Sequence, residues 1–355
     1  MGIRLCGYTP GKRATLEAHV CGLHFAVKAY TTDPASEASL YKALGAVGLA
    51  GETGPRVPRL LTWVPSLRLM AISWLEGTPV NLLLSCGRGQ RAGELAADFL
   101  RRTVSVPVTL GPPLGRTELC AAMKRWVARL FAMNPTLGIH SAEVATSLHR
   151  TELEHSPTRL VHGSFYARHI LDTGDGPGVI DWQRFGQGPL EVDAGMFLAT
   201  ISRIALRHED VTAEAESAEK AFLALTRGLV DENALAWYRA AGLLRLSARR
   251  TKRRPLAELR RLVNEAARFA EFASAGGVVI SYPVNGLDLV DTVTSGGLPD
   301  DTLLMILTII FLLALGSYFL GELSGFSRGK RRNFMGQFYT KTALNDVSNW
   351  LGRHS

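Results

Sequence analysis

The sequence of 355 residues predicts an α+β fold with two lobes, a small β-rich N-terminal lobe and a helical C-terminal lobe, followed by one transmembrane helix. Three observations predict this arrangement. Apolar and polar residues alternate between Ala14 and Tyr30, as they do in strands. Helical periodicity dominates from Met196 to Phe272. Residues 302–321 then form a run of 20 residues without a charge.

Composition limits the class of protein. Hydrophobic residues make up 46% and charged residues 20%, so the chain can build a full core and is not globally disordered. The four cysteines, Cys6, Cys21, Cys86 and Cys120, form no CxxC pair, so we expect no structural zinc and a reducing compartment. No apolar core of signal-peptide length follows the N-terminus, so secretion by that route is not indicated.

The net charge of +8 is concentrated in two basic clusters. Arg245–Arg261 carries +7 and Arg328–Arg332 carries +4, which leaves the rest of the chain slightly acidic. No aromatic residues are interleaved with these charges, so we expect no nucleic-acid partner. Each cluster is interpreted either as a solvated face or loop, or as a site for anionic lipid headgroups.

The N-terminal lobe is assigned to residues 1–80. The alternation over Ala14–Tyr30 predicts a hairpin with Lys28 on the face opposite its apolar residues. Asp33 as N-cap and Pro34 at the first helical position predict a helix through SEASLYKAL. Two further short strands are expected at residues 59–63 and 69–74.

The helical lobe is assigned to residues 81–275. Its pattern changes once, where the short apolar runs RHIL and GVIDW flank TGDGPG, a sequence typical of a hairpin turn. Helices are expected on both sides of this region, near residues 91–102, 117–133, 142–154, 196–207, 213–230, 233–249 and 256–272.

A connector, residues 276–301, leads to the apolar segment 302–321, and a basic tail, residues 322–355, follows it. As a helix the segment would span ~30 Å, the thickness of a bilayer's hydrocarbon core. Asp300, Asp301 and Glu322 bracket it. We predict a single-pass transmembrane helix; the alternatives are a buried core helix and a segment that docks against a partner membrane protein.

Six sequence segments occur in the order found in one enzyme family: YTPGKRATL, FAVKAY, EASLYKAL, HGSFYARHIL, GVIDWQRFGQG and PLEVDAG. On these segments, residues 3–272 resemble the aminoglycoside phosphotransferase-like family, small-molecule kinases with the two-lobed protein-kinase fold. The resemblance implies a kinase-like fold and ATP and Mg²⁺ as cofactors. It does not identify the substrate.

Within the resemblance, Lys28 corresponds to the lysine that contacts the nucleotide phosphates, and Glu37 to the acid that holds this lysine. An ion pair would position the flexible cation. Gly11 and Lys12 lie where the family's phosphate-covering turn is found, although no GxGxxG is present. The alternative is a surface lysine on a strand with an unrelated acid on the next helix.

Asp181 corresponds to the acid that binds magnesium, whose preferred ligands are oxygens. His169 stands where the second metal ligand is usually Asn, and imidazole is a poorer magnesium ligand. Asp193 is expected to cap the following helix and to brace the catalytic loop. His162 is expected to form structural hydrogen bonds within that loop.

Ser164 stands where the family has the catalytic aspartate. A serine hydroxyl does not accept a proton at neutral pH, so the general-base contribution, typically ~10²–10⁴-fold, should be missing. We therefore predict a membrane-anchored pseudokinase or a nucleotide-binding scaffold subunit. The alternative is an active ATP-dependent phosphotransferase that acts on a small-molecule or lipid-linked hydroxyl, with positioning and electrostatics supplying the rate.

The predicted partners are nucleotide, membrane lipid and a membrane-protein complex. Two arguments about orientation conflict. The basic residues 328–332 follow the apolar segment and place the tail in the cytoplasm by the positive-inside rule. The domain implied by the resemblance uses ATP and lacks an export signal, which favours a cytoplasmic N-terminal domain. We adopt the second placement.

Overall fold

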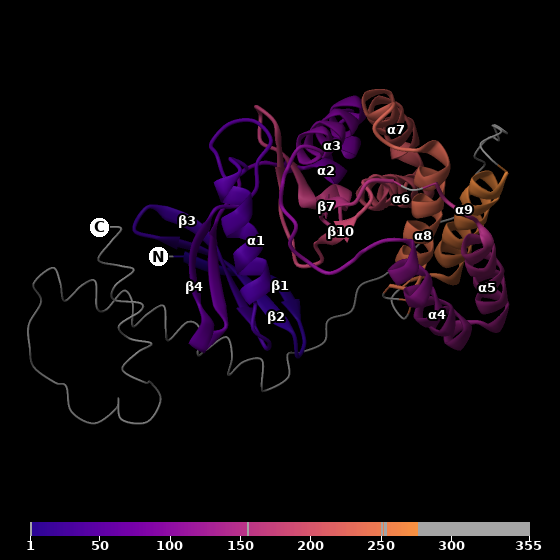
Figure 1. The fold of residues 1–355 in the computed structure, drawn as a ribbon, viewed down its shortest axis with the longest axis horizontal. Helices are drawn as coiled ribbons and strands as arrows, with labels where there is room; N and C mark the ends of the chain where they lie inside the picture. Colours follow the sequence, from indigo (N-terminus) through magenta and orange to yellow (C-terminus); the bar gives the residue numbers. More distant parts are fainter. Residues whose placement is uncertain (1, 155, 250, 252–253, 276–355) are drawn as a thin grey trace, which may run out of the picture. The chain divides into compact units, whose positions relative to one another are not determined.

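The computed structural model describes residues 2–154, 156–249, 251 and 254–275. They form two compact units (Figure 1). Of the described residues, the first unit contains those up to Ala35 and Leu61–Ile72, and the second contains Ser36–Leu60 and those from Ser73 onward. The predicted transmembrane segment 302–321, its connector and the basic tail lie outside the described residues. Within the described ranges, no helix is long and apolar enough to cross a membrane.

The first unit is built on a five-stranded sheet with the order β1-β2-β3-β5-β4. Its strands are β1 Gly2–Thr9, β2 Arg13–Val20, β3 Leu23–Tyr30, β4 Leu60–Val64 and β5 Leu69–Ser73. β2 and β3 pair antiparallel from Arg13 opposite Tyr30 to Val20 opposite Leu23, which confirms the predicted hairpin. The two-residue turn uses positive φ at Cys21 (49°) and Gly22 (78°), as a tight hairpin requires.

The apolar face of this sheet is the one that the alternation predicted. Leu16 and Ala18 of β2 are buried with Phe25, Val27 and Ala29 of β3. Residues two apart on a strand share a face, so one hydrophobic cluster forms there.

The second unit is mainly helical. Its helices are α1 Ala35–Ala46, α2 Val80–Ser85, α3 Gly89–Thr103, α4 Arg116–Met133, α5 Pro135–Arg150, α6 Glu191–Arg207, α7 Thr212–Thr226, α8 Glu232–Ser247 and α9 Leu256–Ser274. Its short strands are β6 Thr78–Pro79, β7 Arg159–Val161, β8 Ile170–Asp172, β9 Pro177–Val179 and β10 Gly186–Gly188. β10 pairs with β7, and β6, β8 and β9 form a second small sheet. The hairpin predicted around TGDGPG is β8–β9.

Two helix starts show how local sequence sets the boundaries. The Asp33 side chain accepts a hydrogen bond from the amide of Ala35, as predicted for an N-cap. The helix predicted from Ala142 begins earlier, at Pro135, because Asn134 accepts a hydrogen bond from Leu137 and Pro135 suits the first helical position.

The core of this unit gathers around α8, whose residues from Ala234 to Ser247 are all buried. Its apolar residues pack with those of α5, α6 and α9 in one cluster. α8 also carries the start of the basic cluster Arg245–Arg261, and Arg245 is only 9% exposed. Both interpretations of that cluster, a solvated face and a lipid-binding face, are therefore wrong for Arg245.

Candidate functional site

A sharp loop follows β7 and contains His162, Gly163 and Ser164. Gly163 has a φ of 67°, and a Cβ atom there would lie 2.0 Å from the carbonyl oxygen of Arg184. Only glycine fits both requirements. This close approach brings residues 162–164 against the segment that follows β9.

Asp193, in the first turn of α6, holds this loop. Its carboxylate accepts hydrogen bonds from the backbone amides of His162 (2.5 Å) and Gly163 (2.8 Å). Burial raises the pKa of Asp193 to about 7. The hydrogen bonds from the two amides and the charge of Arg245 act in the opposite direction and lower this pKa, but burial outweighs them. The predicted bracing role is confirmed. The predicted capping role is wrong, because both carboxylate oxygens bind the loop and α6 begins without a side-chain cap.

Arg245 of α8, which is a cation whereas Asp193 is an acid, contacts the same loop. Its Nη1 atom donates to the carbonyl oxygen of Gly163 at 3.0 Å. Burial lowers the pKa of the Arg245 guanidinium. Gly163 is therefore held at both of its backbone polar groups. Arg245 of α8 binds its carbonyl oxygen, and Asp193 of α6 binds its amide.

His162 has a defined tautomer. Its Nε2 atom lies 2.9 Å from the carbonyl oxygen of Ile180, which only accepts, so Nε2 carries the proton. Its Nδ1 atom accepts from the amide of Ser164 (3.2 Å) and faces the Ser164 Oγ atom at 3.3 Å. The predicted structural role of His162 is confirmed, and the Ser164 hydroxyl donates its proton toward an imidazole nitrogen.

His169 and Asp181 lie together. The Nδ1 atom of His169 donates to the carbonyl oxygen of Ser164 at 3.0 Å. In the neutral ring the Nε2 atom then carries no proton, and its lone pair can accept a hydrogen bond or bind a metal. That nitrogen lies 3.5 Å from the Oδ2 atom of Asp181, a residue in the left-handed region with a φ of 68°. Two acceptors this close are stabilised by a cation between them, and metal-binding histidines commonly donate their second nitrogen to a carbonyl. The pair fits a divalent metal.

The burial of His169 predicts a dependence of stability on pH. Burial lowers the pKa of His169 from 6.5 to about 3, although Asp181 opposes the shift. The unfolded chain therefore binds the extra proton first, so this stability is fully present above pH 6.5 and is lost as the pH falls. We expect a loss on the order of 3 kcal/mol between neutral pH and about pH 4.

Urea unfolding across this range, with EDTA present, measures the effect. The free energy of unfolding of the wild type minus that of His169→Asn should fall by about 3 kcal/mol over this range, because the other titrating groups contribute equally to both proteins. His140→Asn, which removes a half-buried histidine from α5, should keep the wild-type slope. Equal slopes in all three proteins would contradict the assignment.

Comparison with known proteins gives the family. The model of a phosphotransferase enzyme family matches residues 23–229, from the first residue of β3 to the end of α7 and beyond. The chain belongs to this phosphotransferase family. No curated protein sequence matches the chain.

Several solved structures share the fold of this phosphotransferase-family protein. A thermostable mutant of aminoglycoside phosphotransferase APH(4)-Ia has a TM-score of 0.56 at 13% identity, covering 76% of this chain and 94% of that chain. A choline/ethanolamine kinase family protein from Mesorhizobium loti has a TM-score of 0.50 at 14% identity, covering 77% and 88%. A spectinomycin phosphotransferase solved with ADP and spectinomycin has a TM-score of 0.50 at 11% identity, covering 76% and 92%. The fold is therefore the predicted two-lobed kinase-like α+β fold.

The predicted nucleotide-binding residues of this phosphotransferase-family protein fall in both units. Lys28 lies on β3 of the first unit and is 4% exposed, so the alternative of a surface lysine is wrong. Gly11, with a φ of 63°, and exposed Lys12 form the turn between β1 and β2. Glu37 lies in the first turn of α1 in the second unit and is buried.

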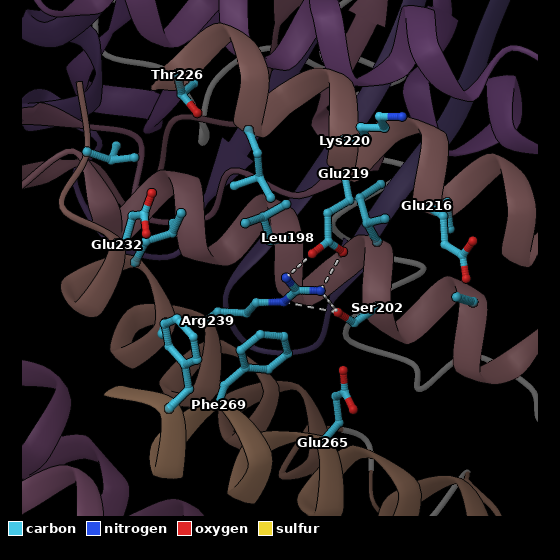
Figure 2. A pocket seen from close by; sticks show the side chains of 18 of the residues that line it. Leu198, Ser202, Glu216, Glu219, Lys220, Thr226, Glu232, Arg239, Glu265 and Phe269 are labelled. Atoms are coloured by element: carbon cyan, nitrogen blue, oxygen red, sulfur yellow. Dashed lines mark hydrogen bonds and ion pairs between the residues drawn. The ribbon is translucent and has the colours of Figure 1, made fainter. Parts of the chain in front are cut away.

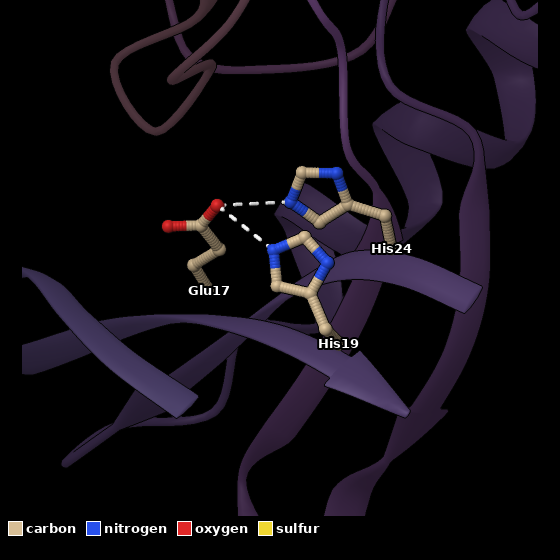
Figure 3. A group of neighbouring side chains, drawn as sticks. All are labelled: Glu17, His19 and His24. Carbon is tan, nitrogen blue, oxygen red and sulfur yellow. Dashed lines mark hydrogen bonds and ion pairs between the residues drawn. The ribbon is translucent and has the colours of Figure 1, made fainter. Parts of the chain in front are cut away.

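One cluster of titratable residues was not predicted. Glu17 and His19 share a face of β2, and His24 lies opposite His19 on β3, so three ligand atoms lie within 4.8 Å of one another (Figure 3). Burial works to raise the pKa of Glu17, but hydrogen bonds from Arg4, His24 and His19 outweigh it and lower the pKa to about 2. This cluster could have been predicted from the sequence. Positions 17 and 19 share one face of a strand, and a two-residue turn pairs position 24 with position 19.

A cavity of about 770 Å³ opens among α6, α7, α8 and α9 (Figure 2). At its side, Arg239 forms an ion pair with Glu219, donates to the Ser202 hydroxyl at 2.7 Å and lies over the ring of Phe269. No residue between 162 and 193 lines this cavity, so it is separate from the loop of Ser164.

Proposed function

We propose that this protein binds nucleotide and a divalent metal, and that it transfers phosphate poorly because Ser164 replaces the family's general base. The observation that carries the proposal is the environment of position 164. The side chain there is a hydroxyl that donates toward Nδ1 of His162, so position 164 offers no carboxylate to take a proton from a substrate hydroxyl.

Nucleotide binding is supported by the fold and by individual residues. The spectinomycin phosphotransferase was solved with ADP, and a thermostable APH(4)-Ia mutant with a TM-score of 0.55 was solved with AMP-PNP. On this chain Lys28 would supply the cation for the phosphates, and the turn at Gly11 and Lys12 would supply the backbone amide of Gly11.

The Nε2 atom of His169 and the carboxylate of Asp181 would hold the metal. When bound, a divalent cation neutralises charge on the nucleotide phosphates. Ser164 contributes through its backbone, because its carbonyl fixes the His169 ring so that Nε2 faces Asp181.

Membrane anchoring through residues 302–321 is part of the proposal and rests on sequence alone. A single-pass anchor with the nucleotide-binding domain in the cytoplasm would give the domain access to ATP. Such a protein would act as a scaffold or as a subunit of a membrane complex.

A second candidate is an active phosphotransferase for a small-molecule or lipid-linked hydroxyl. The contact between the Ser164 hydroxyl and Nδ1 of His162 favours it, because a substrate proton could pass through the hydroxyl to the imidazole. In that case Asp181 and Lys28 would carry most of the rate by positioning and electrostatics.

Thermal denaturation with ATP, with and without MgCl₂, tests the proposal. Saturating ligand at ~100 Kd stabilises a protein by ~2.7 kcal/mol, so we expect a rise of several degrees that depends on magnesium. Asp181→Ala should lose the magnesium-dependent part. Asp98→Ala, which removes an exposed acid from α3, should keep it.

Two results would contradict nucleotide binding through this site. One is the absence of a magnesium-dependent shift in the wild type. The other is an unchanged shift in Asp181→Ala. Steady turnover of ATP with a hydroxyl acceptor by the wild type, lost in Asp181→Ala, would instead support the second candidate.

A further inference from the structure

Arginines gather around Tyr166, which lies in the loop between Ser164 and His169. The Arg168 guanidinium lies 4.4 Å from the centre of the Tyr166 ring, and Arg249 donates to the tyrosine hydroxyl. Arg245 lies 5.9 Å from the same ring. The segment that carries the candidate chemistry is therefore surrounded by positive charge.

A pocket of about 310 Å³ opens beside this segment. α2 lines one part of it, residues 166–168 line a second part, and the end of α6 with the residues after it lines a third. Three arginines contribute to its wall: Arg168, Arg203 and Arg207. Asp210 is the one acid among the lining residues. The volume is at the small end of the range for ligand pockets.

Arg203 is the most unusual group in this pocket. Its Nε atom is buried and has no hydrogen-bond partner among the described residues. Burial lowers the pKa of Arg203 to about 10, and the charges of Arg254, Arg168 and Arg207 lower it further, against the opposing effect of Glu258. A buried donor without a partner destabilises the folded protein, and does so more strongly when it is charged.

This cost has a simple explanation if an anion binds there. Guanidinium groups present paired N–H donors that match the oxygens of phosphate and carboxylate. An anion would give Arg203 a partner and would offset the repulsion among the three arginines. Leu82, Ile204 and Val211 also line the pocket and would contact an apolar part of the same ligand.

We propose that the pocket of Arg168, Arg203 and Arg207 binds a phosphorylated acceptor or ligand, so that this protein recognises an anion beside loop residues 166–168. As a statement about the acceptor, the inference rests on the proposed function. It also excludes cationic aminoglycosides as ligands of this pocket, because they would meet three like charges. The phosphate belongs either to a soluble metabolite or to a lipid headgroup.

Thermal denaturation of the untagged full chain with inorganic phosphate and pyrophosphate tests the site. Both anions should raise the melting temperature of the wild type, pyrophosphate at lower concentration. The double variant Arg203→Met/Arg207→Met keeps an unbranched apolar stem at both positions, removes both charges and should lose the shift. Arg129→Met, which removes an exposed arginine from α4, should keep it.

The stability of the double variant without ligand is a second readout. Removing two mutually repelling cations, of which Arg203 has a buried Nε atom without a partner among the described residues, should leave the melting temperature unchanged or higher. A variant that folds normally and still shows the wild-type phosphate shift would overturn the proposal. So would a marked loss of stability without ligand, because Arg203 and Arg207 would then be structural.

Two ligands with the same headgroup distinguish the sources of the phosphate. Glycerol 3-phosphate represents a soluble acceptor, and dihexanoyl phosphatidic acid represents a lipid. Equal affinities support a soluble ligand, and a tighter short-chain lipid supports a lipid headgroup. A shift produced by hygromycin B but by neither phosphate compound would overturn the proposal.

The two proposals fail separately. Asp181→Ala should lose the magnesium–ATP shift and keep the phosphate shift, because the two sites use different residues. Absence of the ATP shift alone in the wild type would contradict the proposed function. Absence of the phosphate shift alone would contradict the anion pocket.

Discussion

Asp193→Ala is expected to lower the free energy of unfolding of the helical unit by about 3–6 kcal/mol, the largest effect on stability that we predict. The variant leaves two buried backbone amides, those of His162 and Gly163, without acceptors. It also removes the anion that favours the buried charge of Arg245. Because Gly163 is held between these two groups, the loop that carries Ser164 should lose its defined position.

Urea unfolding measured by far-UV circular dichroism gives this free energy. Asp231→Ala is the matched control, since Asp231 caps α8 with one hydrogen bond to Ala234, and its loss should cost only about 1 kcal/mol. Asp193→Asn should lie between the two, because an amide oxygen accepts from one donor while its NH₂ group opposes the other. A loss in Asp193→Ala no greater than in Asp231→Ala would show that the buried carboxylate does not hold the loop.

Ser164→Asp is expected to raise the rate of phosphate transfer by about 10²–10⁴-fold, the usual contribution of a general base. The substitution places a carboxylate at the position that the resemblance assigns to the family's catalytic aspartate. The site around it, with Asp181 and His169 facing each other, stays in place. The increase should therefore appear in kcat, while the affinity for nucleotide changes little.

A coupled assay that follows ADP release in the presence of candidate hydroxyl acceptors measures this increase. Ser164→Ala should be as slow as the wild type, because neither side chain accepts the proton. Asp181→Ala in the Ser164→Asp background should abolish the gain. A wild-type rate that equals that of Ser164→Asp and falls in Ser164→Ala would show instead that the contact of Ser164 with His162 acts as the base.

Much of the fold could be predicted from the sequence because its signals are local. The hairpin of β2 and β3 follows from alternating residues and a two-residue turn, and the N-cap at Asp33 is a contact between near neighbours. The order of short segments along the chain was enough to indicate the phosphotransferase family. The sequence also predicts a departure from the family at Ser164, because the segments around it resemble those that flank the family's catalytic aspartate.

Other features depend on contacts between residues far apart in the chain. Arg245 belongs to a basic run, and only its burial beside the carbonyl of Gly163, 82 residues earlier, shows that it supports the loop. The sequence predicts Asp193 as a helix cap. The structure shows instead that its carboxylate binds the loop amides 30 and 31 residues earlier.

By itself, then, the sequence determined most of the long helices, the β2–β3 and β8–β9 hairpins and the family, because each depends on neighbouring residues or on their order. The tertiary structure decided which polar groups have partners. It turned the His169 lone pair toward Asp181 and gave the Ser164 hydroxyl an acceptor on His162. Among the residues that the structure describes, it left the Nε atom of Arg203 without an acceptor. Hydrogen bonds and desolvation depend on distance and burial in three dimensions, and no local pattern in the chain specifies either.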